Sequence, residues 1–585
     1  MISRNDQGRI FKIAGPAVVV EGMETVQLGD IVFVGDAHLM AEVIRVERSR
    51  AVLQVFEDTT GLRVGEPVTG TGAPLSVELG PGLLGQIYDG VQRPLESLLA
   101  MQGAFLARGA SAPAVSVDRQ WDFVPRVRVG DQLMPGAIIG EVEERPGRMH
   151  RVLVPPAVTG RVDHVDAGRH TVHDPVVRLS DGRSLAMSQR WPVKVGRPFQ
   201  EKLDPTEPFL TGQRVLDALL PICRGGTAII PGGFGTGKTV LEQTLAKCAN
   251  AEIIVYVGCG ERGNEMTDVL SEFPKLDDPV TGRPLMERTI LIANTSNMPV
   301  AAREASVYVG LTMAEYYRDM GYHVALLADS TSRWAEALRE ISSRLEEMPG
   351  EEGYPTYLAS RLAGFYERSG RVRCLGDGDR IGSVTIVGAV SPPGGDYSEP
   401  VTQCSQRTTG AFWALDASLA YRRHFPAISW SRSYSLYARR LEPWYAEHLS
   451  RDWQDSVHAV RELLQRDAEL QEVVQLVGPE GLQNHERVIL ETGRAIREDF
   501  LQQNATSPTD MHCVLAKQHA MLRTLLFFHR VSSEAARKGV GVEKILALPQ
   551  RELLSRMKEV PAAEIEAYVE RFQREFEEAV RQLVP

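Results

Sequence analysis

Pro231-Gly-Gly-Phe-Gly-Thr-Gly-Lys-Thr-Val240 is the stretch that decides how the middle of this chain folds. From residue 232 to residue 239 it matches G-x-x-x-x-G-K-[ST], the phosphate-binding loop. Glycines let the backbone curl until successive N–H groups face the phosphates, and the helix that begins here adds its positive end. We expect Lys238 to contact the terminal phosphates and Thr239 to ligate Mg²⁺. The residues predicted to surround the phosphates are Gly232, Gly233, Phe234, Gly235, Thr236, Gly237, Lys238, Thr239 and Val240.

The flanks of this loop favour a phosphate site over a chance match. Residues 227–230 form a short apolar run typical of a strand, and residues 240–248 are rich in helix-forming residues. A phosphate-binding loop requires the order strand, loop, helix. The alternative, a Gly-rich surface turn that happens to end in Lys-Thr, does not require these flanks.

Composition narrows the class of protein. With 585 residues the chain exceeds what one hydrophobic core supports, which predicts about three or four domains. A net charge of -11 argues against nucleic acid as the main partner. The six cysteines include no C-x-x-C pair and are expected to be reduced thiols. Because the chain shows neither a signal peptide nor an apolar run long enough to cross a bilayer, we expect a cytoplasmic protein.

Changes of pattern along the chain predict a multidomain α/β protein. Residues 1–73 have the closely spaced apolar runs of a small β-barrel, and residues 74–109 read as a linker with a short helix. Residues 110–190 are a second β-rich block of barrel-sandwich type. Residues 191–440 alternate strands and helices, as expected of a parallel-sheet domain around the phosphate-binding loop. Residues 441–585 are expected to form a helical bundle.

The β-rich block at 110–190 resembles biotinyl and lipoyl carrier domains in its strands and turns. Carriers need a lysine to bear the cofactor, and this block has none, so we keep the fold and reject the carrier function. His164, His170 and His173 lie there beside aspartates and could suggest a metal site. Their spacing matches no ligand pattern, which favours a solvated polar hairpin.

Two carboxylates follow candidate strands of the central domain. Residues 253–257 form a buried-type strand that leads to Glu261, and residues 323–328 end at Asp329. Because ligands bind at the carboxyl ends of parallel strands, both side chains are expected near a bound nucleotide. Glu261 would orient the attacking water, unless it only pairs with Arg262. Asp329 would hold Mg²⁺ directly or through its water shell, unless it only caps a helix.

Four further motifs carry a resemblance to a known family: Gly258-Cys-Gly-Glu-Arg-Gly-Asn-Glu-Met-Thr267, the segment 294–305, the segment 328–340 and Ser391-Pro-Pro-Gly-Gly-Asp396. Together with the phosphate-binding loop they resemble the catalytic A subunits of V-type and archaeal-type rotary ATPases. The likeness covers nearly the whole chain, and the block at 110–190 resembles the insertion that distinguishes these subunits.

The resemblance implies a site for ATP or ADP with Mg²⁺. Lys238, Glu261 and Arg262 would be catalytic, with Arg262 beside the terminal phosphate. Thr239 and Asp329 would hold the metal ion, Asp329 through water. An adenine pocket would be bordered by Phe425, Phe500, Gln502 and Gln503. Phe425 could equally belong to the hydrophobic core.

The resemblance also implies partners. A non-catalytic B-type subunit would supply an arginine finger, and the complex would contain central rotor shaft subunits, a peripheral stalk and a membrane ion-translocating sector. The chain would then work in the cytoplasm, peripheral to the membrane through other subunits, and couple ATP turnover to proton or sodium transport. Two alternatives are a non-catalytic nucleotide-binding subunit of the same machine and a hexameric flagellar or secretion export ATPase. The presence of Lys238 with Glu261 disfavours the first, and the insertion disfavours the second.

Overall fold

The computed structural model describes residues 6–103, 107–279, 281–376, 378–478 and 481–584. The chain forms two compact units. The first unit comprises Met1–Asp204, Ala251–Pro392 and Asp396–Thr408, and the second comprises Pro205–Asn250, Pro393–Gly395 and Thr409–Pro585. Each unit is described by itself below.

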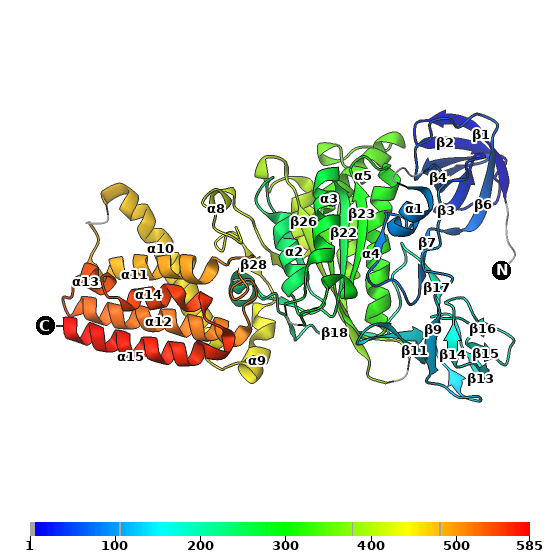
Figure 1. Cartoon of the computed structure of the whole chain (residues 1–585). Helices are drawn as coiled ribbons and strands as arrows, with labels where there is room; N and C mark the ends of the chain where they lie inside the picture. The colour runs from blue at the N-terminus through cyan, green and yellow to red at the C-terminus, as the bar shows by residue number, and fades with distance from the viewer. Residues whose placement is uncertain (1–5, 104–106, 280, 377, 479–480, 585) are drawn as a thin grey trace. The chain divides into compact units, whose positions relative to one another are not determined.

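The first unit begins with a closed six-stranded barrel, drawn in dark blue in Figure 1. Its strands follow the order β1-β2-β5-β4-β3-β6, and every pair is antiparallel. Alternate residues point inward, so that valines such as Val18, Val20 and Val32 form the barrel core. The predicted barrel is confirmed. The strands are β1 (Gln7–Ala14), β2 (Ala17–Glu21), β3 (Asp30–Val34), β4 (Leu39–Glu47), β5 (Arg50–Val55) and β6 (Pro67–Pro74).

After the barrel come two short strands and one short helix. The helix α1 (Leu95–Gln102) begins directly after Pro94, as the sequence suggests, because proline fits the start of a helix without losing a hydrogen bond. Strand β7 (Ser76–Leu79) pairs with β17 (Gln189–Pro192), and β8 (Ile87–Tyr88) extends the parallel sheet described below.

The inserted β-rich block is built from two four-stranded sheets. One has the order β10-β13-β15-β16 and the other β12-β11-β9-β14. Apolar residues on the strands, including Phe123, Ile139 and Val162, are buried and form its core. The strands are β9 (Trp121–Pro125), β10 (Gln132–Leu133), β11 (Ile138–Arg145), β12 (Arg148–Leu153), β13 (Gly160–Val165), β14 (Gly168–His170), β15 (Val177–Leu179) and β16 (Ser184–Leu185).

A buried carboxylate joins this block to the rest of the first unit. Glu144 accepts hydrogen bonds from the backbone N–H groups of Gly82 and Leu84 and from the Tyr317 hydroxyl, at 2.8–3.0 Å. Its other partner is His150, whose Nδ1 lies 2.8 Å from Glu144 Oε2. Burial by itself would raise the pKa of Glu144. The charge and hydrogen bond of His150, together with the N–H groups of Leu84 and Gly82, outweigh burial and lower this pKa, so that Glu144 is favoured as the carboxylate ion.

The largest element of the first unit is a parallel sheet with the order β26-β24-β22-β23-β8. Its central strands are buried along nearly their whole length, which explains their continuous apolar sequences. Helices α4 and α5 pack against β22 and β26 (Figure 1). The elements are β22 (Ile253–Glu261), α3 (Gly263–Glu272), β23 (Thr289–Thr295), α4 (Val300–Asp319), β24 (His323–Asp329), α5 (Thr331–Arg344), α6 (Leu358–Glu367) and β26 (Ile381–Val390).

The second unit contains the phosphate-binding loop and the C-terminal helices. Strand β21 (Thr227–Pro231) leads through the loop into helix α2 (Lys238–Cys248), the order that the sequence predicts. Strand β21 pairs in parallel with β27 (Ala411–Phe412), which pairs with β28 (Tyr434–Ser435). One turn of π-helix, η1 (Val215–Leu219), precedes β21.

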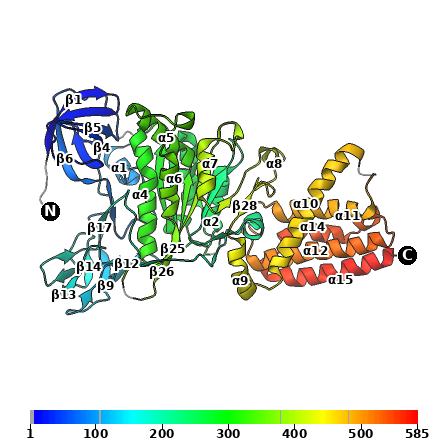
Figure 2. The same cartoon turned by 180° about the vertical axis from the view of Figure 1, so that it is seen from behind.

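The helices of the second unit form a bundle, in which Figure 2 shows α12 and α15 side by side. The last helix buries one face made of Ile565, Val569, Phe572, Phe576 and Val580. Leu583, the last residue of this helix, is only half-buried. In the described part of the chain no helix is long and apolar enough to cross a membrane. The long helices are α9 (Ala438–His448), α10 (Trp453–Val477), α11 (Asn484–Ala495), α12 (Leu515–Arg537) and α15 (Ile565–Leu583).

Candidate functional site

Two glycines give the phosphate-binding loop its curled backbone. Gly235 has φ +75° and Gly237 has φ +88°, both in the left-handed region that other residues rarely adopt. Gly232 is needed for space, because a Cβ there would lie 2.7 Å from Thr236 Oγ1 and 2.8 Å from Leu415 Cβ. Gly233 has no such requirement, since the nearest atom to its Cβ would be 4.0 Å away.

Hydrogen bonds between residues close in sequence hold the side chains of Lys238 and Thr236 in place. Lys238 Nζ donates to the carbonyls of Gly232 (2.7 Å) and Gly233 (3.0 Å), and Thr236 Oγ1 donates to the same Gly233 carbonyl (2.8 Å). Lys238 and Thr239 occupy the first two positions of α2, so both stand at the positive end of the helix. The loop therefore gathers an ammonium, a hydroxyl and a helix N-terminus in one place, which suits an anion of high charge.

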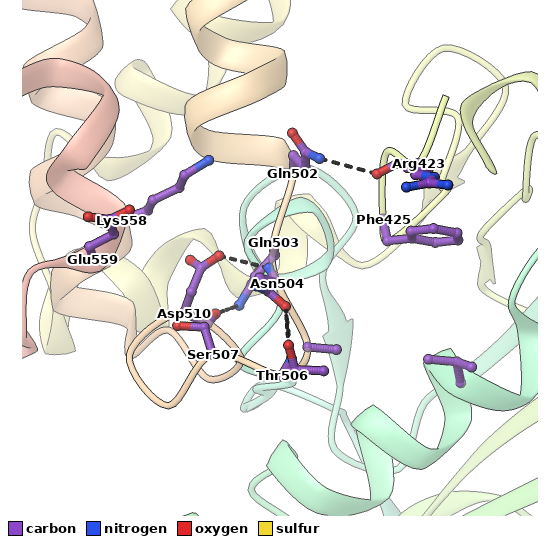
Figure 3. Close-up of a pocket in the computed structure, with 12 residues that line it drawn as sticks. Arg423, Phe425, Gln502, Gln503, Asn504, Thr506, Ser507, Asp510, Lys558 and Glu559 are labelled. Carbon is purple, nitrogen blue, oxygen red and sulfur yellow. Dashed lines mark hydrogen bonds between the residues drawn. The ribbon is translucent and has the colours of Figure 1, made fainter. Parts of the chain in front are cut away.

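A cavity of about 590 Å³ lies beside the loop in the second unit (Figure 3). Phe425 borders it, and its ring packs near the loop, because a Cβ on Gly237 would lie 3.5 Å from Phe425 Cε1. Gln502 also lines the cavity and donates to the Arg423 carbonyl at 3.2 Å. The lining consists of Val240, Arg423, Phe425, Gln502, Gln503, Asn504, Ala505, Thr506, Ser507, Asp510, Lys558 and Glu559.

The remaining two residues predicted to border adenine are placed differently. Phe500 is fully buried in the core and does not line the cavity. Gln503 lines it, but its side-chain amide is bonded to protein: Nε2 donates to Gly212 O (2.8 Å) and Asp510 O (2.6 Å). The Gln503 side chain thus supports the wall of the cavity.

The predicted carboxylates lie in the first unit, at the ends of neighbouring parallel strands. Glu261 is the last residue of β22 and Asp329 is the last residue of β24. In the register of these strands Gly258 is paired with Asp329. Asp329 is buried, and Tyr256 Oη donates to its Oδ2 at 3.3 Å. The sheet thus brings together two acids that are 68 positions apart in sequence (329 − 261).

The surroundings of Glu261 favour its neutral form. Burial raises its pKa, and the nearby charges of Asp329 and Glu265 raise it further, to about 8. The guanidinium of Arg333 acts in the opposite direction. A carboxylate that titrates near neutral pH, at the end of a sheet strand, is suited to exchange a hydrogen bond or a proton with a substrate water.

Arg262 is the most exposed of the predicted catalytic residues. Its side chain is 53% exposed, and its Nη1 lies 3.9 Å from Glu265 Oε1, beyond hydrogen-bond distance. The ion pair recorded for Arg262 is thus with Glu265. Arg262 stands at the start of α3 and is accessible to solvent.

Two arginines that we did not assign from the sequence lie beside Glu261. Arg303 is buried at the start of α4, and its Nη2 donates to Ser296 O (2.8 Å), while Ser296 N donates to Glu261 O (2.7 Å). A Cβ on Gly260 would lie 2.7 Å from Arg303 Cδ and 2.9 Å from Arg333 Cβ. Both arginines fall inside the motifs quoted above, and each lies in the first turns of a helix that follows a sheet strand. That position is the signal that could have identified them.

Two histidines of the inserted block each lie near one carboxylate. His173 Nε2 lies 3.4 Å from Glu78 Oε1, and His170 Nε2 lies 3.9 Å from Asp166 Oδ1. Across the ranges that the structure describes, no three His, Cys, Asp or Glu side chains are grouped so that they could hold a metal ion.

Comparisons with known proteins agree with this architecture. Family models match four successive parts of the chain. These are the ATP synthase alpha/beta family β-barrel domain (residues 10–72), the alpha/beta subunit barrel-sandwich domain (112–194), the alpha/beta family nucleotide-binding domain (212–435) and the C-terminal domain of V and A type ATP synthase (442–546).

Full-length relatives decide the family. The chain is 55% identical to the A subunit of the A-type ATP synthase of Methanopyrus kandleri, over 100% of this chain and 99% of the relative. It is 57% identical to an A subunit, numbered 2, of the A-type ATP synthase of Methanospirillum hungatei, over 94% of each. The chain belongs to the family of A-type ATP synthase A subunits. The predicted family and fold class are thereby confirmed, and the nucleotide-binding domain of this family member includes the phosphate-binding loop, Glu261 and Asp329.

Membership also decides between the functions considered from the sequence. A catalytic subunit of a rotary V/A-type ATPase, which makes or hydrolyses ATP within a complex of several subunits, is the function that these relatives support. A solved structure of the assembled ATPase EscN, from an enteropathogenic E. coli type III secretion system, aligns with a TM-score of 0.64, covering 89% of this chain and 100% of that chain. At 19% identity this likeness shows a shared fold alone.

Proposed function

We propose that this chain converts ATP with Mg²⁺ in an ion-translocating rotary complex, and that its reaction couples ATP turnover to transport of protons or sodium ions. The observation that supports the proposal is that one chain carries both sets of residues that ATP hydrolysis needs. The second unit holds a phosphate-binding loop with Lys238 and Thr239 at a helix N-terminus, and the first holds Glu261 and Asp329 at the ends of adjacent strands.

In hydrolysis, water would attack the terminal phosphorus in line with the bridging oxygen. The bond from that phosphorus to the bridging oxygen breaks, which yields ADP, phosphate and a proton. Glu261 would accept a hydrogen bond from the attacking water, and Lys238 would stabilise the charge on the terminal phosphate oxygens. Arg262, accessible at the start of α3, would lie beside the same phosphate.

The oxygen donors present fit a hard divalent cation. The Thr239 hydroxyl and the Asp329 carboxylate are ligands of the kind that Mg²⁺ accepts, directly or through water. Mg²⁺, when bound, would offset the negative charge of the phosphates. The adenine would lie in the 590 Å³ cavity against Phe425, whose ring offers a stacking face, with Gln502 at its border.

Partners complete the proposed machine. A B-type subunit would supply an arginine finger, and rotor shaft subunits would contact the helical bundle. The inserted block would meet the peripheral stalk, and the membrane sector would carry the ion. Since an arginine finger contributes about 10³ to 10⁵ in rate, the isolated chain is expected to turn over slowly.

The test is reconstitution. The chain would be purified by itself and together with its B-type partner and shaft, and ATP turnover would be measured with and without Mg²⁺. We expect Mg²⁺-dependent turnover that is about 10³-fold or more faster in the complex. Equal turnover by the isolated chain would contradict the need for a partner's arginine. Assembly without a shaft subunit would contradict the rotary part of the proposal.

A further inference from the structure

Arg214 is a fully buried arginine whose guanidinium bonds to the segment that lines the cavity. Its side chain is 0% exposed. Nη1 donates to Asp510 Oδ1 (2.5 Å), Nη2 donates to the Gln502 carbonyl (2.7 Å), and Nε donates to the Phe500 carbonyl. One planar group therefore bridges both ends of the segment 500–510, a task that suits the fixed fork of donors on arginine.

The bonds around Arg214 continue into the wall of the cavity. Asp510 Oδ2 accepts from the Asn504 backbone N–H at 2.7 Å, and the Arg214 backbone N–H donates to Gln503 Oε1 at 2.9 Å. The backbone N–H of Gln503 then donates to the Phe425 carbonyl at 2.8 Å. Through these bonds Arg214 is connected to Phe425, the aromatic residue that faces the cavity (Figure 3).

The segment that carries Arg214 is itself held firmly. Asp217 accepts hydrogen bonds from Thr211 N (2.7 Å), Thr211 Oγ1 (2.7 Å) and Gly212 N (2.9 Å). Gly212 lies so close to the chain just after the segment 500–510 that a Cβ on it would be 2.4 Å from His512 Cδ2. The chain then runs through η1 to β21 and the phosphate-binding loop. The elements that shape the cavity and the loop are thus joined by a short stretch of chain.

We propose that Arg214 is a positioning residue for the nucleotide base: it holds the segment 500–510 against Phe425, so that the base cavity is formed before nucleotide binds. This inference rests on the proposed function, because it requires the base to occupy that cavity. A preformed cavity lowers the entropy cost of binding the base. The guanidinium bonds of Arg214 reach the segment 500–510 and not the phosphate-binding loop, so its loss would weaken base recognition and spare phosphate recognition.

The test compares two ligands on the full chain with Arg214→Lys. Lysine keeps the positive charge beside Asp510 but cannot reach all three acceptors at once. Dissociation constants would be measured by calorimetry for MgADP and for Mg²⁺–tripolyphosphate, which has no base. We expect the Kd for MgADP to rise at least about tenfold, as for the loss of one charge-assisted hydrogen bond, with the Kd for tripolyphosphate unchanged. Unchanged MgADP affinity, or an equal loss for both ligands, would overturn the proposal.

Controls separate this role from folding and from the proposed function. Arg224→Lys alters another arginine of the same unit, paired with Glu207 outside the cavity lining, and should change neither constant. Asp510→Asn leaves one acceptor oxygen where the carboxylate offers two, so it cannot accept from both the Arg214 guanidinium and the Asn504 N–H, and it adds no volume. It should reproduce the split between ligands even if Arg214→Lys does not fold.

Phe425→Ala separates the positioning role of Arg214 from the proposed base site itself. If it lowers MgADP affinity while Arg214→Lys does not, only the positioning role is overturned. If Phe425→Ala leaves MgADP affinity unchanged, the base does not bind in this cavity, and the proposed base site fails together with the inference.

Discussion

The phosphate-binding loop and the Glu261 cluster are built in opposite ways. In the loop, the side-chain bonds that Lys238 and Thr236 make to glycine carbonyls join residues no more than six positions apart. Around Glu261, the groups come from the ends of β22 and β24 and from the starts of α4 and α5. The geometry of the phosphate-binding loop therefore depends on local backbone conformation. The geometry of the Glu261 cluster depends on the register of strands that are distant in sequence.

The two regions also differ in their electrostatics. Lys238 is a cation that donates to backbone carbonyls, at a helix N-terminus that favours anions. Glu261 is a largely buried acid near two other acids, Asp329 and Glu265, and burial together with these charges raises its pKa to about 8. The loop is thus suited to bind an anion, whereas Glu261 is suited to gain or lose a proton near neutral pH.

Removing the Glu261 carboxylate should have the strongest effect on turnover. Glu261→Gln in the assembled complex should lower turnover at least about a hundredfold while nucleotide binding is retained, because the amide cannot accept the proton or orient the water as a carboxylate does. Steady-state rates and Kd values would be measured together. Glu272→Gln, on the exposed face of α3, is the matched control. Retained turnover would assign the water to another residue.

Lys238→Ala tests the loop and should act on binding itself. Removing the ammonium deletes charge-assisted contacts to phosphate, so the affinity for MgADP should fall about tenfold to a hundredfold. Calorimetry on the full chain measures this. Lys247→Ala, in the last turn of the same helix, should leave affinity unaltered. Unaltered affinity in Lys238→Ala would contradict the phosphate-binding assignment.

A third prediction concerns stability and pH. Because the folded chain raises the pKa of Glu261 from 4.5 to about 8, ionising it costs stability as pH rises through that range. Glu261→Gln removes the cost. The variant should match the native chain near pH 4 and exceed it at pH 9 by roughly 2 kcal/mol in the free energy of unfolding, allowing for partial exposure. Urea unfolding at both pH values measures the difference, and a gain that is equal at both would show that ionisation is not its cause.

The smallest effect separates two neighbouring glycines of the loop. Gly235→Ala should cost about 1 kcal/mol of stability, since alanine at φ +75° is strained although no atom obstructs its Cβ. Gly233→Ala has neither obstacle and should be neutral or slightly stabilising through the unfolded state. Thermal unfolding of both variants tests whether backbone conformation alone shapes the loop. Equal destabilisation by the two substitutions would contradict that view.

Sequence reasoning identified the strand, loop and helix around Lys238, because the motif and its flanks lie within about 20 residues. It also placed Glu261 and Asp329 after apolar runs of strand type, which the structure shows as the ends of β22 and β24. It ended the first strand too early, at residue 257, whereas β22 continues to Glu261. Gly258 and Gly260 interrupt the apolar pattern there, and the strand is extended by pairing with β23, whose last residue Thr295 is paired with Glu261.

Arg214 shows what a local pattern does not reveal. It resembles many other arginines in sequence, and only packing shows that it is fully buried against Phe500 and Asp510. Phe500 itself looked like a cavity residue, yet it is buried in the core. Burial and hydrogen-bond partners depend on segments hundreds of positions apart, such as 214 and 510, which no local pattern records.

Residue patterns alone predict the order of the barrel, sheet and helical regions, the phosphate-binding loop and the acids at two strand ends. These predictions depend on short-range periodicity, on glycine conformation and on the rule that parallel strands end at one edge of a sheet. The burial of Arg214, the aromatic ring that faces the cavity and the bonds that shape the cavity wall are visible only in the folded chain. Those outcomes follow from close packing and from the need to pair every buried charge, and both are properties of the whole fold.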